Sequence, residues 1–146
     1  MTVREGDRAE DAVARLVAWF RRDGADLPWR RTRDRYRVLV AETQLQATQV
    51  ARVVPYYERF VARWPTAADL AAAPLGDVLA EWHGLGYPRR ARNLRAAAAV
   101  VAADGWPPDD RLTDLPGVGP YTAAAIRCFA DGQDVLPLDT NAARAG

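Results

Sequence analysis

The spacing of apolar residues along the chain predicts helices throughout. Apolar side chains recur every three or four positions across residues 11–22, and Asp23 with Gly24 ends that segment. The same spacing predicts two helices between residues 36 and 60, with Pro55 in the first turn of the second helix or kinking it. Further helices are expected at residues 67–73, 74–82 and 89–103. The segment from residue 112 to residue 130 is expected to form a short helix, a tight loop and a longer helix. No segment shows the alternation of a convincing strand, so the fold class is all-α, with roughly eight to ten short helices.

Two glycine–x–glycine turns interrupt the helical pattern, at residues 84–86 and 117–119. In the second turn, within the hairpin at residues 115–122, glycines one residue apart allow backbone N–H groups to point outward. A helix is predicted to begin there, so its unpaired N–H groups and its dipole face the same way and form a seat for a phosphate group. Phosphate contacts of this kind position a nucleic acid without reading its sequence. A helical corner that only packs is the structural alternative.

The chain of 146 residues carries 20 basic and 19 acidic residues, and the net charge of +1 excludes a general polycation but not a local basic face. All of the basic residues are arginine, which pairs with phosphate through two parallel hydrogen bonds. They concentrate in two clusters: Arg30, Arg31, Arg33, Arg35 and Arg37, and Arg89, Arg90, Arg92 and Arg95. Each cluster predicts a DNA-binding face, with a solvated helix surface that holds ion pairs as the alternative.

Rare residue types exclude several kinds of chemistry. The single cysteine, Cys128, excludes an internal disulfide and any multi-cysteine metal site in this chain, and the single histidine, His83, excludes zinc signatures with two histidines. The absence of lysine excludes a lysine Schiff base. No apolar run approaches the roughly 18 residues of a membrane-spanning helix, and the charged first 20 residues do not resemble a signal peptide. We therefore expect a cytoplasmic protein.

Two carboxylates adjoin apolar runs. Glu42 follows the apolar residues 38–41 in a predicted helix, where burial would favour its protonated form and suit it to act as a general acid near neutral pH. The alternative for Glu42 is a solvent-facing position on an amphipathic helix. Asp139 follows the apolar residues 135–138 and is placed to cap a helix that begins near Thr140.

The chain resembles the helix–hairpin–helix DNA glycosylases (HhH-GPD superfamily), and in particular the MutY-type adenine glycosylases. The resemblance covers the chain from about residue 12 to residue 146 and rests on motifs in the order of that family: Leu27–Arg30, Val40–Val50, Pro55–Phe60, Trp82–Tyr87, the hairpin and Leu138–Asn141. It implies base-excision repair by hydrolysis of the N-glycosidic bond of adenine mispaired with 8-oxoguanine or guanine. The expected partner is double-stranded DNA with a mispair or a damaged base, not a membrane, and the expected state is a nucleoid-associated monomer.

The resemblance also implies roles for four catalytic residues. Glu42 would protonate the departing adenine, Asp139 would stabilise the sugar cation or bond to it, and Asn141 would orient water or Asp139. Tyr121 stands where bifunctional relatives have the lyase lysine, so the enzyme would be monofunctional and leave an abasic site. Packing at the start of a helix is the alternative for Tyr121.

A base pocket and a DNA contact surface are implied as well. The base pocket and wedge would consist of Trp29, Arg30, Leu45, Gln46 and Tyr87. The phosphate contacts would come from Gly117, Val118, Gly119, Thr122, Arg89 and Arg90. Core packing is the alternative for Trp29 and Tyr87. Two positions depart from the family pattern, since Ala47 replaces a glutamine that inserts into the duplex and Gln44 replaces an apolar residue of the motif.

The resemblance divides the chain into residues 1–29, the N-terminal helix of a split second subdomain, residues 30–137, the six-helix subdomain with the hairpin, and residues 138–146, the start of a truncated C-terminal segment. Relatives continue with helices that hold a [4Fe–4S] cluster through four cysteines and, in MutY, with a domain that reads 8-oxoguanine. Those iron–sulfur helices are absent from this chain and their cysteines would lie beyond residue 146, so we expect no cofactor encoded here.

Because the chain ends shortly after Asp139, we expect a fragment, a truncated reading frame or a chain with low or no activity. Two other functions stay open on the sequence alone. One is a thymine or uracil mismatch glycosylase of the same superfamily. The other is a non-catalytic helix–hairpin–helix module that binds DNA.

Overall fold

The computed structural model describes residues 11–15 and 27–137, and every regular element within that part is a helix. Residues 11–15 are helical, and the rest of the helix predicted at 11–22 lies outside the described residues. The other elements, in chain order, are η1 (Pro28–Arg30), α2 (Arg35–Leu45), α3 (Val50–Arg63), α4 (Ala67–Ala72), α5 (Leu75–Trp82), α6 (Arg89–Asp104), η2 (Asp109–Asp114), α7 (Pro120–Ala125) and η3 (Ile126–Ala130). The all-α prediction is confirmed, and none of these helices is long and apolar enough to cross a membrane.

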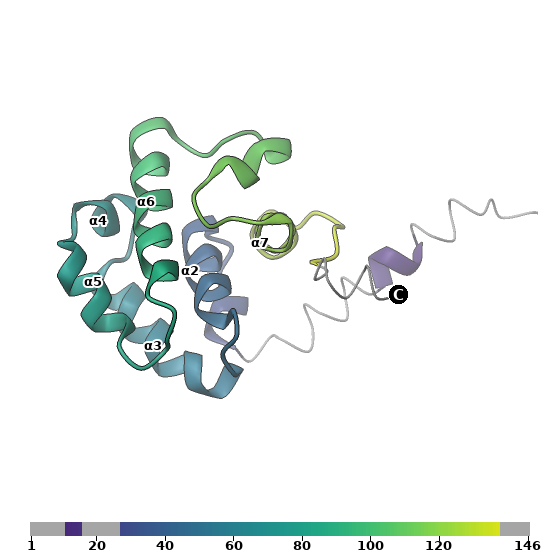
Figure 1. Ribbon diagram of the computed structural model, residues 1–146. Coiled ribbons are helices and arrows are strands. Elements are labelled where there is room, and N and C mark those ends of the chain that lie inside the picture. Colours follow the sequence, from purple (N-terminus) through teal and green to yellow (C-terminus); the bar gives the residue numbers. More distant parts are fainter. Residues whose placement is uncertain (1–10, 16–26, 138–146) are drawn as a thin grey trace, which may run out of the picture.

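Helix α2 lies in the interior of the structure, between α6 and α7 (Figure 1). Asp34 starts it by accepting a hydrogen bond from the backbone N–H of Tyr36. Every residue from Val38 to Gln44 is buried, because α3, α6, α7 and η3 all contact α2. The neighbouring helices therefore hold the C-terminal end of α2, with its side chains and carbonyl groups, in place.

Helix α3 begins earlier than its proline suggests. Pro55 lies inside α3, past the first turn, so the first-turn alternative is wrong and the proline is within the helix, as the second alternative required. The helix extends back to Val50 because Val53, Tyr57 and Phe60 form one buried face. Burial of that face offsets the backbone hydrogen bond that a proline cannot donate.

The helices that follow agree with the apolar pattern more closely. The segments predicted at 67–73, 74–82 and 89–103 form α4, α5 and α6 with ends that differ by no more than one residue. Thr66 caps α4 by accepting a hydrogen bond from the backbone N–H of Asp69. Gly105, with a φ of 80°, ends α6.

The predicted segment from residue 112 to residue 130 contains three elements and a turn. A 3₁₀ helix, η2, leads into the glycine hairpin, and α7 leaves the hairpin and continues directly into the π-helical turn η3. Both α7 and η3 contact α2, so the hairpin is held beside the C-terminal half of that helix. This arrangement brings two motifs that are distant in sequence to one place.

Candidate functional site

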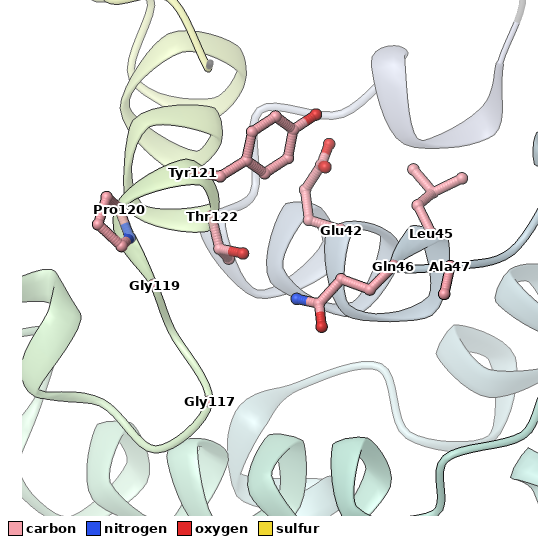
Figure 2. A pocket seen from close by; sticks show the side chains of 9 residues that line it. All are labelled: Glu42, Leu45, Gln46, Ala47, Gly117, Gly119, Pro120, Tyr121 and Thr122. Atoms are coloured by element: carbon pink, nitrogen blue, oxygen red, sulfur yellow. The ribbon is translucent and has the colours of Figure 1, made fainter. Parts of the chain in front are cut away.

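A cavity of about 700 Å³ opens between the C-terminal part of α2 and the glycine hairpin with the start of α7 (Figure 2). Its lining residues are Glu42, Leu45, Gln46, Ala47, Gly117, Gly119, Pro120, Tyr121 and Thr122. Seven of these nine were proposed as site residues from the sequence. The remaining two are Ala47, noted only as a departure from the family pattern, and Pro120. The structure therefore brings the predicted acid and the predicted hairpin to one cavity.

Glu42 supplies the acid of this cavity. Its position on the enclosed helix α2 leaves only 2% of the residue exposed. Burial raises the pKa of the Glu42 carboxyl, and the nearby charge and hydrogen bond of Arg30 lower it. The expected burial of Glu42 is confirmed and the solvent-facing alternative is wrong, whereas its role as a general acid stays a prediction.

Arg30 is the counter-charge of Glu42, and it comes from η1. Its Nη2 atom donates a hydrogen bond to Oε1 of Glu42 at 3.2 Å. The guanidinium also lies over the Phe129 ring, 3.5 Å from the ring centroid, which fixes the plane of the fork. Its Nη1 atom is buried and has no hydrogen-bond partner among the described residues. Arg30 does not itself line the cavity, so the described residues give it a role in holding Glu42 and not the base-pocket position predicted for it.

Trp29 lies elsewhere, although it precedes Arg30 in the chain. It is fully buried and meets the Tyr57 ring edge-on, with ring centroids 5.4 Å apart. It does not line the cavity, so the described residues agree with the core-packing alternative for Trp29. Gln44 is also fully buried and absent from the lining, so this departure from the family pattern does not make the cavity wall polar.

The two glycines of the hairpin meet different constraints. Gly117 has a φ of 75°, and a Cβ added there would lie 2.7 Å from Cβ of Asn93 on α6. Gly119 has a φ of −91°, and an added Cβ would meet nothing within 4 Å. The fold therefore requires a glycine at 117 and not at 119, where the missing side chain leaves open space beside the cavity. Val118 is buried and its backbone N–H donates to the carbonyl oxygen of Leu115 at 3.1 Å, so it is not free for the phosphate contact predicted for it. Thr122 lines the cavity from α7.

Tyr121 is partly exposed at the start of α7, and Figure 2 shows its ring and the Glu42 carboxyl directed into the same cavity. A ring that faces the cavity is in a position to contact a ligand there. Packing at the helix start does not by itself account for this direction.

A second hollow of about 290 Å³ adjoins the cavity, with Gln46 and Ala47 lining both. Tyr87 lines this hollow and is 69% exposed, so its core-packing alternative is wrong. Sequence reasoning missed the backbone conformation here, because Ala47 and Tyr87 both have positive φ, at 58° and 50°. Alanine and tyrosine carry no local signal for such a conformation.

Only part of the two arginine clusters forms an exposed basic surface. In the first cluster, Arg35 forms ion pairs with Asp109 and Asp131, as the ion-pair alternative supposed. In the second, Arg89 is exposed and available to a phosphate, whereas Arg90 donates to backbone carbonyl groups. Both terminal nitrogens of Arg90 are used in this way and its Nε atom is buried without a partner, so the structure does not offer Arg90 for the phosphate contact predicted for it.

Asp139 and Asn141 lie outside the described residues, so the predicted convergence of Glu42 and Asp139 stays a prediction. The segment that leads toward them is anchored. Gln133 donates a hydrogen bond to Asp109 at 2.8 Å, and Arg127 donates one to Gln133 at 2.8 Å. The chain is thus fixed to η2 a few residues before Asp139.

No group of three or more metal-ligating side chains occurs in the part of the chain that the structure describes. The single cysteine, Cys128, is fully buried. One buried thiol does not supply the four thiolates that a [4Fe–4S] cluster needs. The residues of this chain therefore do not fit that cluster.

Known proteins resemble this chain in sequence and in fold. A family model described as the HhH-GPD superfamily of base excision DNA repair proteins matches residues 40–145. An adenine DNA glycosylase of Mycobacterium tuberculosis (strain H37Rv) is 47% identical over 134 residues, which cover 88% of this chain and 44% of that protein. The human adenine DNA glycosylase is 43% identical over 142 residues, which cover 88% of this chain and 26% of that protein.

Among solved structures, a thermostable thymine-DNA glycosylase matches with a TM-score of 0.77 and 31% identity, over 97% of this chain and 68% of that one. A non-covalent endonuclease III–DNA complex matches with a TM-score of 0.70 and 25% identity, over 99% of this chain and 68% of that one. The chain spans less than half the length of the curated relatives it matches.

Proposed function

Because the chain belongs to the HhH-GPD superfamily of base excision DNA repair proteins, we propose that it hydrolyses the N-glycosidic bond of adenine mispaired with 8-oxoguanine or guanine. The observation that supports this most is the buried Glu42 carboxyl, with its raised pKa, in a cavity that the glycine hairpin borders. The identity of 47% to an adenine DNA glycosylase favours adenine as the base.

Glu42 acts as the general acid in this proposal. As the bond between the base and the sugar breaks, its electron pair moves into the purine, and Glu42 donates its proton to a ring nitrogen of the departing base. Arg30 holds the carboxyl in place through the hydrogen bond from its Nη2 atom to Oε1 of Glu42. Asp139 stabilises the cationic sugar, and Asn141 orients the water that adds to it. Tyr121 lines the cavity without a lyase role, because a tyrosine cannot form a Schiff base.

Double-stranded DNA with a mispair is the proposed partner. The backbone of the hairpin approaches a phosphate at Gly119, where no side chain stands in the way. Arg89 supplies an exposed positive charge nearby, and Tyr87 enters the gap that the extruded base leaves. A single chain supplies all of these residues, so the proposed working state is a monomer.

Replacement of Glu42 by glutamine tests the proposal. With a duplex that contains adenine opposite 8-oxoguanine, single-turnover release of adenine in Glu42→Gln should fall at least about 100-fold, while the dissociation constant for the duplex changes little. Glu58→Gln, on an exposed position of α3, is the matched control and should release adenine as the parent chain does.

The base identity is tested with duplexes that carry adenine, thymine or uracil opposite guanine. Release of thymine or uracil without adenine would replace the proposed substrate by that of a thymine or uracil glycosylase. Binding without release of any base would identify a DNA-binding module. The product strand should stay intact until it is treated with alkali, because the proposed reaction stops at the abasic site.

A further inference from the structure

Two residues other than glycine have a left-handed backbone in the part of the chain that the structure describes, namely Ala47 and Tyr87. Such conformations are unfavourable for residues with a Cβ atom and persist only where the surrounding structure enforces them. Ala47 follows α2, and Tyr87 lies in the turn between α5 and α6. Both line the hollow of about 290 Å³ beside the cavity. The left-handed residues are thus grouped in space although they are distant in sequence.

Arg90 contacts the peptide groups that precede both of them. It donates hydrogen bonds to the carbonyl oxygen of Gln46, directly before Ala47, and to that of Gly86, directly before Tyr87, the latter at 3.1 Å. The φ angle of a residue is the rotation about its N–Cα bond relative to the preceding peptide plane. A donor that fixes the carbonyl group of that plane therefore restrains the φ angle of the next residue.

The remaining hydrogen bonds of Arg90 hold the same two segments. It donates to the carbonyl oxygens of Thr43 at 2.9 Å and Gln44 at 3.3 Å, in the last turn of α2, and to that of Leu85 at 3.3 Å. Its guanidinium also lies over the ring of Tyr87, 5.7 Å from the ring centroid. Only the planar fork of an arginine spreads several donors over two separate segments, since a lysine has a single nitrogen.

We propose that Arg90 is a positioning residue that holds Ala47 and Tyr87 in their left-handed conformations and thereby sets how the chain distinguishes a mispaired duplex from a matched one. The second part rests on the proposed function. Ala47 and Tyr87 form the rim at which the duplex is interrupted, so their geometry governs the fit to a distorted duplex. General attraction to DNA depends on exposed charge with donors to spare, whereas Arg90 is half-buried and its terminal nitrogens already donate to five carbonyl oxygens.

The backbone conformation is measured first, without DNA. Three-bond couplings between the amide and α protons, with the ¹³Cα shifts, report the φ angles of Ala47 and Tyr87 in solution. Arg90→Lys should move both sets of values toward those of negative or averaged φ, while Arg89→Gln should leave them unchanged. Unchanged values in Arg90→Lys would overturn the proposal.

Binding is measured next, with matched and mispaired duplexes over a range of salt concentrations. Arg90→Lys should lower the preference for the mispaired duplex by roughly fivefold or more and leave the affinity for the matched duplex within about twofold. Arg89→Gln should weaken both affinities alike and reduce the salt slope by about one. If Arg90 instead contacts a phosphate, Arg90→Lys will keep the preference and Arg90→Gln will reduce the salt slope as Arg89→Gln does, which would contradict the proposal.

Two variants at position 47 leave Arg90 intact and keep the test decisive if Arg90→Lys does not fold. Ala47→Pro fixes φ near about −65° and should lose the preference. The preceding residue already has the extended conformation that a proline requires, because Gln46 has a φ of −60° and a ψ of 120°. Ala47→Gly adopts the left-handed conformation freely and should keep the preference. Equal preference in Ala47→Pro and Ala47→Gly would refute the role of this conformation.

The failure of the proposed function gives a different result. In that case the parent chain itself shows no preference for any mispair and releases no base, while the couplings of Ala47 and Tyr87 still respond to Arg90→Lys. If the couplings do not respond and the parent chain does prefer a mispair, the proposed function stands and Arg90 is not its positioning residue.

Discussion

Removal of the Arg30 charge tests how the structure holds a buried acid. In Arg30→Met the side chain keeps an apolar stem against Phe129 and loses its contact with Glu42. That contact joins Nη2 and Oε1 at 3.2 Å, and two unit charges at this separation attract each other by about 5 kcal/mol at an effective dielectric constant of about 20. Loss of one partner from a buried pair costs about 3–5 kcal/mol. The side chains of Arg30 and Glu42 are 12% and 1% exposed, so solvent screens the pair little. We therefore expect Arg30→Met to lower the free energy of unfolding at pH 8 by an amount within that range.

The loss of unfolding free energy in Arg30→Met should increase from acid to alkaline pH. Burial raises the pKa of Glu42, Arg30 opposes that rise, and without Arg30 the pKa rises further. Below the ordinary glutamate pKa of about 4.3, the carboxyl is neutral in folded and unfolded chains, so the variant loses little beyond packing. As the pH rises through the folded-state pKa, the unfolded chain binds fewer protons than the folded chain, and stability falls. This fall is larger without Arg30, so the difference between variant and parent grows from acid to alkaline pH.

Urea unfolding at pH 4 and pH 8 measures this difference. Arg63→Met is the matched control, because Arg63 pairs with Asp77 and Glu81 on the surface and its side chain is 45% exposed. Arg63→Met should lower the free energy of unfolding by less than about 1 kcal/mol at either pH. In a Glu42→Gln background, Arg30→Met should show no pH dependence. A loss in Arg30→Met that is equal at pH 4 and pH 8 would refute the reasoning, because it would mean that Arg30 contributes packing and not charge.

Three further outcomes follow from the site and its surroundings. The alkaline limb of adenine release should move to higher pH in Arg30→Met, as read from single-turnover rates, because the acid keeps its proton longer. Gly117→Ala should lower the unfolding free energy by at least about 1–2 kcal/mol through strain at its φ of 75°, whereas Gly119→Ala should leave thermal unfolding nearly unchanged and weaken DNA binding in a titration. Hydrogen bonds from Gln133 and then Arg35 lower the pKa of Asp109, so its contribution to stability is present above the ordinary aspartate pKa and is lost as the pH falls through the folded-state pKa. Asp109→Asn should therefore reduce the fall in melting temperature on acidification, and an unchanged fall would contradict this.

Local signals in the sequence were enough to predict most of the helices and to single out Glu42 and the glycine hairpin as the two parts of the site. The apolar period placed α4, α5 and α6, since each buries one face and is followed within two residues by a proline or glycine. Of the two positions left open for Pro55, the first turn was wrong, because its local preference for a first turn was outweighed by the buried face of α3. Glu42 and the hairpin were each identified by their neighbours in sequence, and the contacts of α7 with α2 bring them together.

The partners of the arginines could not be predicted in the same way. Arg30 and Arg90 both belong to clusters that suggest a basic surface, yet Arg30 reaches a carboxylate on α2 and Arg90 reaches carbonyl groups of two other segments. A long side chain with several donors bonds to whatever acceptors the fold brings near it. Which acceptors an arginine reaches depends on tertiary contacts, and these leave no periodic pattern in the sequence.

The position of α2 links the chemistry to the recognition of DNA. Glu42 and Ala47 are five residues apart, and most of the span between them is one enclosed helix that rises by about 1.5 Å per residue. Arg90 fixes the last turn of that helix to the turn that carries Tyr87. The distance between the proton donor and the rim is therefore set by a rigid element and not by a loop. A substitution at the end of α2 that leaves Glu42 in place should then change which duplexes react while the pH dependence of base release stays as it is. A shift in that pH dependence would mean that the rim and the acid are not separate parts of the site.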